Sequence, residues 1–174
     1  MTTESHTPVT GVTGEHTTDG LPHGSTSITP HIVVSPAAEA LEFYSAVFGA
    51  RVVDVTRFPG DAGTELVAHA VLDFGTGMLT LSDPLESYGL VVTDPERGAS
   101  YSLAVYVPAV DEVTEAAAAR GATVREKPAS FVSGDRFASV LDPFGVRWSI
   151  MTRVDDISPE ESARRVAEWA ATQS

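Results

Sequence analysis

The sequence predicts an α+β fold made of two tandem copies of one βαβββ module, followed by a C-terminal helix. The main observation is an internal repeat, because residues 36–52 and 108–124 share Pro, Ala, acidic, aliphatic, Gly and Val positions at a constant offset of 72 residues. Each copy also shows a short apolar strand, an Ala-rich helix and three β-branched or alternating runs. The length of 174 residues fits two small modules that share one core.

Residues 1–28 are expected to form a disordered leader. They are rich in Thr, Gly, Ser and His and contain almost no large apolar side chains, so they bury too little surface to offset the entropy of ordering. The leader holds His6, His16 and His23 at irregular spacing. These histidines could bind a metal, but a solvated tail is the simpler interpretation.

The first module is expected over residues 29–82. It begins with a strand at Thr29–Val34, and its helix ends at Gly49, where a helix C-terminus favours a residue that tolerates positive φ. Three strands follow at Ala50–Arg57, Glu65–Phe74 and Met78–Ser82.

The second module is expected over residues 101–153, after a linker at 83–100 that is punctuated by prolines and glycines. Its first strand is expected at Tyr101–Val107 and its helix ends at Gly121. Its other strands are expected at Ala122–Lys127, Phe137–Leu141 and Arg147–Thr152.

Residues 154–174 are expected to form a capping helix. Ser158-Pro159-Glu160-Glu161 is a capping box with Pro at the first helical position. Ala163, Val166 and Trp169 then recur at helical spacing and form an apolar stripe. This stripe could pack on the same domain or on a partner subunit.

The composition argues against several classes of function. With 24 Asp and Glu against 11 Lys and Arg, the formal net charge is −13, which disfavours nucleic acid and membrane surfaces as partners. The absence of cysteine excludes disulfides, thiol nucleophiles, zinc-thiolate sites and iron–sulfur clusters. No apolar run approaches the roughly 20 residues of a membrane span, and no secretory pattern is present. We therefore expect a cytoplasmic protein.

The alternation of side chains along the strands predicts a ligand-binding face. One face of each strand is aliphatic, as the helix layer requires, whereas the other mixes hydroxyls, a histidine, a tyrosine and small residues. If the modules curve around this second face, it lines a pocket for a small molecule. A solvated face or a dimer surface is the alternative. The candidate ligand-binding residues are Thr29, His31, Thr80, Ser102, Tyr106, Phe137 and Ser149.

Several motifs together resemble a known family. They are Thr29-Pro30-His31, Glu42-Phe43-Tyr44 with Phe48-Gly49-Ala50, His69-Ala70, Leu81-Ser82-Asp83, Gly134-Asp135-Arg136-Phe137, Asp142-Pro143-Phe144-Gly145 with Trp148-Ser149, and Asp156-Ile157-Ser158-Pro159-Glu160-Glu161. Over about residues 28–170 the chain resembles the vicinal oxygen chelate superfamily, which includes glyoxalase I, extradiol dioxygenases and bleomycin-resistance proteins. It is most similar to the PhnB-like branch.

The resemblance implies a cup-shaped mixed sheet around a cavity, of the glyoxalase-like fold, and often a homodimer. In metal-dependent members, a His on the first strand and a Glu on the last strand of each module bind a divalent ion. Those positions fall at Thr29, Thr80, Ser102 and Ser149, and neutral hydroxyls are poor ligands for such an ion. We therefore expect no metal site. A slip of two residues would instead make His31 a ligand, so a divalent metal remains an alternative.

Two histidines are candidates for acid–base catalysis. His31 lies on the proposed pocket face, and His69 lies in the middle of a strand. A hydrogen-bonded structural role is the alternative for each. Gly134-Asp135-Arg136 is interpreted as a turn fixed by pairing of its charged side chains, with direct ligand contact as the alternative. Asp142-Pro143-Phe144-Gly145 is interpreted as a turn that sets strand register and has no further function. No phosphate-binding loop and no Gly-x-Ser-x-Gly motif occurs.

These observations favour two functional hypotheses, and a structural or regulatory partner with a vestigial pocket is a third possibility. In the first, the chain binds or sequesters a small organic metabolite or antibiotic in a pocket between the modules, and its acidic surface favours a cationic ligand. In the second, it is an enzyme that uses His31 or His69, with or without a metal, in a lyase, isomerase or dioxygenase-like reaction. The sequence does not decide between them.

Overall fold

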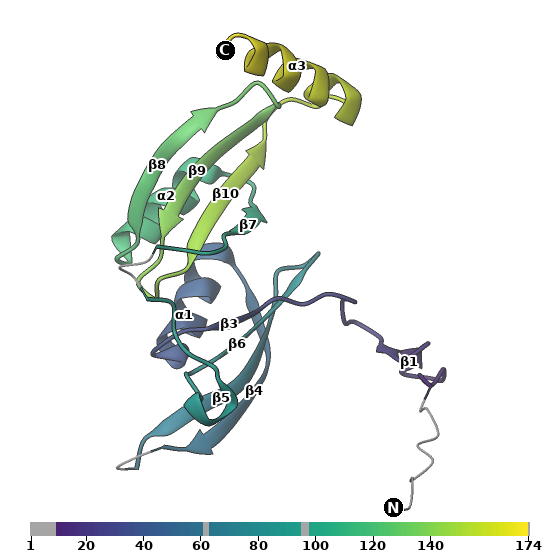
Figure 1. The fold of residues 1–174 in the computed structure, drawn as a ribbon, viewed down its shortest axis with the longest axis vertical. Helices are drawn as coiled ribbons and strands as arrows, with labels where there is room; N and C mark the ends of the chain where they lie inside the picture. Colours follow the sequence, from purple (N-terminus) through teal and green to yellow (C-terminus); the bar gives the residue numbers. More distant parts are fainter. Residues whose placement is uncertain (1–9, 61–62, 95–97, 174) are drawn as a thin grey trace, which may run out of the picture.

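The computed structural model describes residues 10–60, 63–94 and 98–173, and it contains the two predicted modules. In Figure 1 the first module lies below the second, and the last helix lies beyond the second module. The modules form two four-stranded mixed sheets, in agreement with the predicted α+β fold class.

The first module has the order strand, helix, three strands. It consists of β3 (His31–Val33), α1 (Ala37–Phe48), β4 (Arg51–Pro59), β5 (Glu65–Asp73) and β6 (Met78–Ser82). The sheet order is β3-β6-β5-β4, in which β3 runs parallel to β6 and the other pairs are antiparallel. Gly49 follows α1 with φ of 69°, which explains why glycine ends this helix.

The second module repeats this topology. It consists of β7 (Leu103–Tyr106), α2 (Val110–Ala119), β8 (Thr123–Ser130), β9 (Asp135–Leu141) and β10 (Arg147–Arg153). The sheet order is β7-β10-β9-β8, again with one parallel pair, between β7 and β10. The predicted strands are therefore confirmed, although β3 and β7 are shorter than expected. Thr29 and Ser102 lie outside them.

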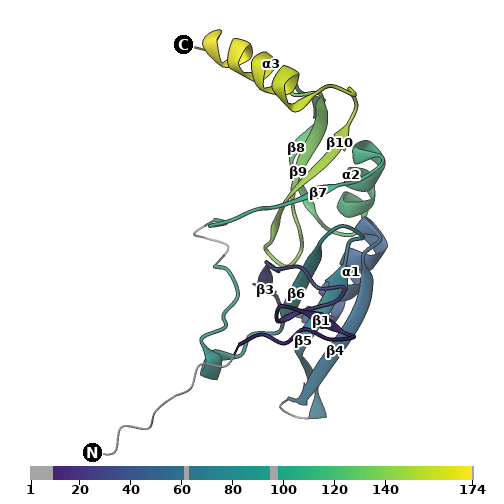
Figure 2. The same cartoon turned by 90° about the vertical axis from the view of Figure 1, so that its right-hand side faces the viewer.

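Both helices cover the same side of the two sheets. Figure 2 shows α1 and α2 stacked on that side, which leaves the opposite face of each sheet without a helix. The buried apolar residues of both modules belong to one core, which runs from Ile32 and Tyr44 to Trp148 and Ile150. Burial of this shared core stabilises both halves together.

Equivalent strand ends hold the start of each helix. In the first module, the buried carboxylate of Asp83 accepts hydrogen bonds from the backbone N–H of Ala37, at 2.9 Å, and of Val67, at 2.8 Å. In the second, the hydroxyl of Thr152 accepts a bond from the N–H of Val110 at 2.9 Å. Each acceptor satisfies an N–H of the first helical turn that has no partner within the helix.

Three segments lie outside the modules. Residues 10–28 belong to the expected leader and contain a short hairpin, β1 (Thr17–Thr18) with β2 (Leu21–Pro22), which projects away from the body in Figure 1; residues 1–9 lie outside the described residues. The linker contains the 3-10 turn η2 (Glu86–Tyr88). Neither the hairpin nor the turn was predicted.

The C-terminal helix α3 (Pro159–Ala171) begins as the capping box predicts. Ser158 Oγ accepts a hydrogen bond from the N–H of Glu161 at 3.2 Å. Trp169 packs edge-on against Phe131, with ring centroids 4.9 Å apart. Among the described residues, no helix is long and apolar enough to cross a membrane.

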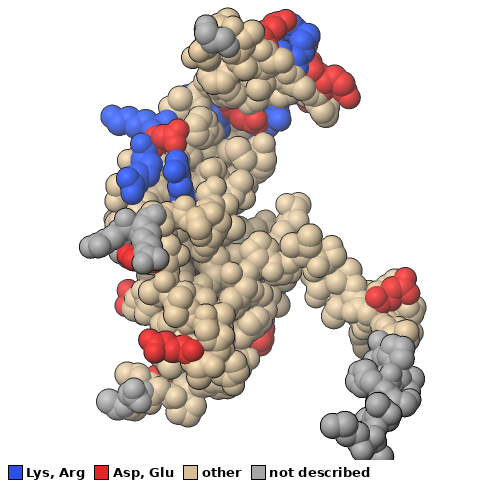
Figure 3. Space-filling view, in the orientation of Figure 1, with Lys and Arg blue, Asp and Glu red and all other residues tan. Residues whose placement is uncertain are grey.

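Charge is unevenly distributed over the surface. On the face shown in Figure 3, Lys and Arg gather on the second module and on α3, whereas the first module shows only Asp and Glu. On this face, the first module is therefore the more acidic of the two modules.

Candidate functional site

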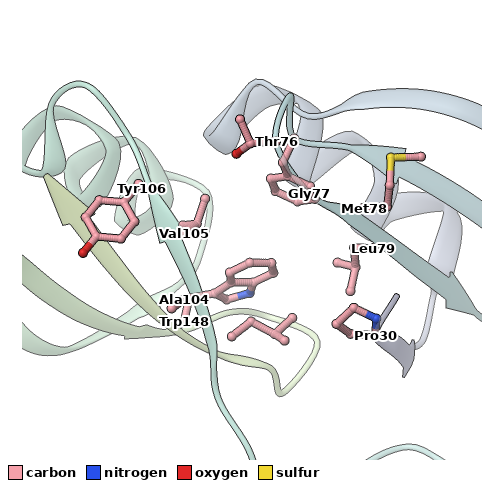
Figure 4. A pocket seen from close by; sticks show the side chains of 11 residues that line it. Pro30, Thr76, Gly77, Met78, Leu79, Ala104, Val105, Tyr106 and Trp148 are labelled. Atoms are coloured by element: carbon pink, nitrogen blue, oxygen red, sulfur yellow. The ribbon is translucent and has the colours of Figure 1, made fainter. Parts of the chain in front are cut away.

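A cavity of about 250 Å³ lies between the two modules. Figure 4 shows β7 on one side and the β5–β6 hairpin with Pro30 on the other, with the ring of Trp148 between them. The lining residues carry no formal charge. They are Pro30, Phe74, Thr76, Gly77, Met78, Leu79, Leu103, Ala104, Val105, Tyr106 and Trp148. The cavity is slightly smaller than the range of about 300–1,000 Å³ that is usual for ligand pockets, but its apolar lining is typical of them.

The topology explains why the cavity forms here. β3 and β7 each form one edge of their sheet, and in the described part of the chain these two strands do not pair with each other. Both faces of β7 can therefore contribute, so Leu103 and Val105 line the cavity together with Ala104 and Tyr106.

Tyr106 is the one predicted ligand-binding residue that lines this cavity. Its hydroxyl donates a hydrogen bond to Oδ1 of Asp135 at 3.3 Å, and Asp135 also pairs with Arg153 at 3.2 Å. The motif at Gly134 thus has the structural role that the sequence indicated, although its charged residues pair with other partners. Arg136 binds both carboxylate oxygens of Asp111 at 2.6 Å.

Two other predicted residues of the second module, Phe137 and Ser149, lie on its uncovered face. Phe137 is paired with Met151, which is paired with Tyr106, so these three side chains form one row across the sheet. Ser149 lies in the next row, beside Ala104. Ser102 is exposed outside β7 and does not line the cavity.

In the first module, the two predicted histidines come together. The imidazole rings of His31 and His69 are stacked, with centroids 6.1 Å apart and planes 5° from parallel. His31 Nδ1 lies 2.9 Å from Thr80 Oγ1, and His31 Nε2 lies 3.2 Å from Ser82 Oγ. Thr29 instead bonds to the hydroxyl of Thr26 at 2.8 Å, away from this pair.

The donor and acceptor in each of these hydrogen bonds follow from the bond that Thr80 makes to a backbone carbonyl. Thr80 Oγ1 donates to the carbonyl oxygen of Pro30 at 3.1 Å, and a carbonyl can only accept. The single Thr80 proton is therefore used, so Thr80 accepts from Nδ1–H of His31. Nε2 of the neutral ring then accepts from the hydroxyl of Ser82.

Burial lowers the pKa of His31, and the neighbouring His69 lowers it further because two adjacent positive charges repel each other. Both effects favour the neutral ring that these hydrogen bonds require. His69 is exposed, and it has no hydrogen bond or ion pair to a described residue. The two histidines therefore differ in the availability of their nitrogen atoms.

Strand register shows which residues of the first strands lie beside Thr80 and Ser149. The parallel strand pairs place His31 beside Thr80 in the first module and Ala104 beside Ser149 in the second. The register therefore brings His31, rather than Thr29, next to Thr80, and Ala104, rather than Ser102, next to Ser149. Each of these residues lies two positions after the one that the resemblance implied.

These four residues do not fit a divalent metal centre. Both nitrogens of His31 are engaged, Thr80 uses its proton on Pro30, and Ala104 offers no donor atom. Across the described ranges, no three His, Cys, Asp or Glu side chains gather into a metal-binding group. A catalytic divalent ion requires several imidazole or carboxylate ligands, so the donor set argues against the ligand geometry of the metal-dependent members.

Sequence reasoning missed most of the cavity lining. Trp148, Leu79 and Leu103 belong to the aliphatic or aromatic pattern that predicted helix packing, so they were assigned to the core. Trp148 is only 2% exposed and does belong to the core, but one edge of its ring reaches the gap between the sheets (Figure 4). The sequence signal that could have found Trp148 is its place on the strand next to the edge strand β7.

A hydrogen-bonded carboxylate links the modules behind the cavity. Asp142 Oδ2 accepts bonds from the hydroxyl of Tyr44 in α1 at 2.8 Å and from Nε1 of Trp148 at 2.9 Å. Its Oδ1 accepts from the N–H groups of Phe144 and Val146. Burial raises the pKa of Asp142, while these hydrogen bonds oppose the shift. The Asp142 turn therefore does more than set strand register.

Comparison with known proteins identifies relatives of this chain. An uncharacterised protein of Mycobacterium tuberculosis strain H37Rv is 32% identical over 136 residues, which cover 78% of this chain and 79% of that protein. Among solved structures, protein PA1353 from Pseudomonas aeruginosa is similar with a TM-score of 0.61 and 21% identity, over 75% of this chain and 100% of that chain. A PhnB protein from Bacillus cereus is similar with a TM-score of 0.56 and 21% identity, over 73% and 99%. The two structures support the fold.

A family model provides the assignment. The model described as Glyoxalase/Bleomycin resistance protein/Dioxygenase superfamily matches residues 20–150, which include both modules up to the middle of β10. The doubled βαβββ topology and the PhnB neighbour agree with that match. The chain therefore belongs to the Glyoxalase/Bleomycin resistance protein/Dioxygenase superfamily.

Proposed function

We propose that the chain binds a small organic molecule in the inter-module cavity and sequesters a metabolite or an antibiotic there. The observation that carries this proposal is the uncharged lining of the cavity, with Trp148 at its floor and Tyr106 at its rim. An aromatic floor with few polar groups is the usual character of a site that binds the apolar part of a ligand.

The charge of the protein supports a cationic ligand. The formal net charge is −13, which raises the local concentration of cations near the surface. The cavity itself has no charged side chain among its lining residues, so this attraction acts at long range. Salt should therefore slow association with a cationic compound more than it accelerates dissociation.

The proposal is tested by calorimetric titration and thermal denaturation with a panel of neutral and cationic organic compounds, including cationic antibiotics. The test variant is Ala104→Phe, which places a large side chain in the cavity. The control is Ala129→Phe, because Ala129 is an exposed strand residue of β8 that does not line the cavity. We expect binding in the wild type and the control and its loss in Ala104→Phe. No binding by the wild type, or equal binding by both variants, would contradict the proposal.

Metal-free acid–base catalysis is a second candidate function. It is favoured by the exposed imidazole of His69, which makes no hydrogen bond to a described residue and so can exchange a proton with a ligand. His31 is less suited because both of its nitrogens are engaged. Turnover that is lost in His69→Ala and is insensitive to chelator would support catalysis.

We also propose that the protein forms a homodimer. The edge strand β4 exposes Val52, Val53 and Phe58 at 40%, 46% and 47%, and one of its backbone edges has no strand partner among the described residues. A second copy would cover this apolar edge. Sedimentation equilibrium should give twice the chain mass, and Val53→Asp should shift it toward one chain.

A further inference from the structure

In the described part of the first module, two neighbouring histidines differ in their hydrogen bonds. His69 is exposed and has no polar partner, whereas His31 has two. His69 of β5 stacks on His31 of β3 across the intervening strand β6. Ser82 and Thr80 bind the two nitrogens of His31, whereas His69 has no hydrogen bond to a described residue. This asymmetry separates the two histidines that the sequence offered as candidates for acid–base catalysis.

His31 cannot offer a nitrogen to a ligand without breaking an existing hydrogen bond. Its Nδ1–H is donated to Thr80, and its Nε2 lone pair accepts from Ser82, which is itself fully buried. An exposed ring face remains, but the nitrogen atoms are occupied. His31 therefore acts as a fixed surface against which the ring of His69 is oriented.

We propose that His69 is the imidazole that contacts the bound molecule and that His31 is a positioning residue; this proposal rests on the proposed function. The bound molecule is a neutral or cationic compound with a hydrogen-bonding group. The strand pair that holds His31 and Thr80 continues into Pro30 and Met78, which line the inter-module cavity. The polar and apolar parts of one ligand can therefore lie along the same strands.

The charges around His69 define the ligand class. Asp54 pairs with Val71, which pairs with Thr80, so the carboxylate of Asp54 lies on the same face and diagonally next to His69. Asp54 has no ion-pair partner among the described residues. The guanidinium of Arg51, in the neighbouring part of β4, is bound to Asp73 at 2.7 Å. Arg57 pairs with Val67, on the other side of His69, and its guanidinium lies 3.9 Å from Glu65. Both arginines of this part of β4 have a carboxylate partner, whereas Asp54 has no cationic one, so the described part of this face disfavours an anion.

The assignment of the histidines is tested without a ligand by chemical modification. Diethyl pyrocarbonate acylates an unprotonated imidazole nitrogen, forming an N–C bond while ethanol and carbon dioxide leave. In the full chain at neutral pH, peptide mapping should show His69 modified at a rate similar to that of exposed His16. His31 should react about tenfold more slowly, since reaction requires loss of a hydrogen bond.

Variants make this result specific. Ser82→Ala removes the donor to Nε2, so it should raise the modification rate of His31 toward that of His69, with little effect on His16. Nitrogen-15 NMR of the wild type should independently show His31 protonated at Nδ1. Equal modification of His31 and His69, protection of His69, or a proton on Nε2 of neutral His31 would overturn the proposal.

The ligand class is tested with one aromatic scaffold that carries an amine, an amide or a carboxylate. The amine and amide should bind at least about tenfold more tightly than the carboxylate, and His69→Ala should weaken their binding, whereas His16→Ala should not. Preference for the carboxylate, or unchanged binding by His69→Ala, would overturn the inference while leaving the cavity proposal intact. If none of the three compounds binds the wild type, the proposed function itself is contradicted. The rates of histidine modification would still show whether His69 or His31 has the accessible nitrogen.

Discussion

The hydroxyl of Tyr44 in α1 lies 2.8 Å from Oδ2 of Asp142 in the turn between β9 and β10, so a side chain of the first module binds a buried carboxylate of the second. Trp148, at the floor of the inter-module cavity, donates to the same oxygen at 2.9 Å. The position of the cavity floor therefore depends on a contact between the two repeats.

Replacing Tyr44 with Phe should weaken this contact. The variant removes one hydrogen bond to a buried carboxyl group and leaves the ring in place, so the free energy of unfolding should fall by about 1.5–3 kcal/mol. Urea denaturation measures this change. Tyr88→Phe is the control, because Tyr88 is 74% exposed, and its substitution should change stability by less than about 0.5 kcal/mol.

The stability of the protein should depend on the titration of Asp142. Burial raises the pKa of this carboxyl group in the folded state, so the folded protein binds the proton more readily than the unfolded chain. The preferential protonation of Asp142 in the folded state stabilises the protein fully below the pKa of this group in the unfolded chain, about 3.9. This stabilisation is lost as the pH rises through the raised pKa of Asp142 in the folded state.

The comparison is with Asp142→Asn, which does not titrate. Relative to this variant, the wild type should lose about 1.4 kcal/mol for each unit by which its pKa is raised, as the pH increases across that interval. Urea denaturation at several pH values from acidic to neutral provides the difference. A difference that is constant or that grows with pH would show that the carboxyl pKa is not raised.

The two helix-start contacts should contribute unequally. Asp83→Ala leaves two buried N–H groups, those of Ala37 and Val67, without an acceptor, so it should cost about 2–4 kcal/mol. Thr152→Val leaves only the N–H of Val110 and should cost about 1–2 kcal/mol. Thermal or urea denaturation tests the order, and a larger effect of Thr152→Val would contradict this account of the two modules.

A side chain at Gly134 should cost more stability than one at Gly145. Its φ is 86°, and an added Cβ would lie 3.0 Å from Nη1 of Arg153 and 3.1 Å from Cβ of Asp155. Gly145 has the same φ of 86° but open space around an added Cβ. Both Gly→Ala variants should lose about 1 kcal/mol from backbone strain, and Gly134→Ala should lose more. Equal losses would mean that the neighbours of Gly134 move aside freely.

The repeat and the strand alternation predicted most of the fold because both are local patterns. Equivalent residues such as Gly49 and Gly121 are separated by a constant offset, which reveals a duplicated module. The aliphatic face of each strand reveals the side that a helix covers. The start of β3 was wrong by two residues, since Pro30 and Thr29 lie before the first ladder pair at His31. His31, rather than Thr29, therefore lies beside Thr80.

The cavity could be predicted only in part because it depends on how the two sheets meet. Tyr106 was found from its alternating position on β7, but Trp148 and Leu79 share the pattern of core residues and line the cavity only because β3 and β7 are unpaired edges. The different states of His31 and His69 depend on hydrogen bonds between strands that lie far apart in the sequence. No local pattern contains that information.

The most direct test of ligand binding between the modules is the emission of Trp148. The chain has two tryptophans, so Trp169→Phe leaves Trp148 as the single reporter at the cavity floor. A neutral or cationic compound that binds should change this emission saturably in Trp169→Phe, and the change should disappear when Ala104→Phe is added. An unchanged emission on binding, or the same change after Ala104→Phe, would show that the ligand does not occupy the inter-module cavity.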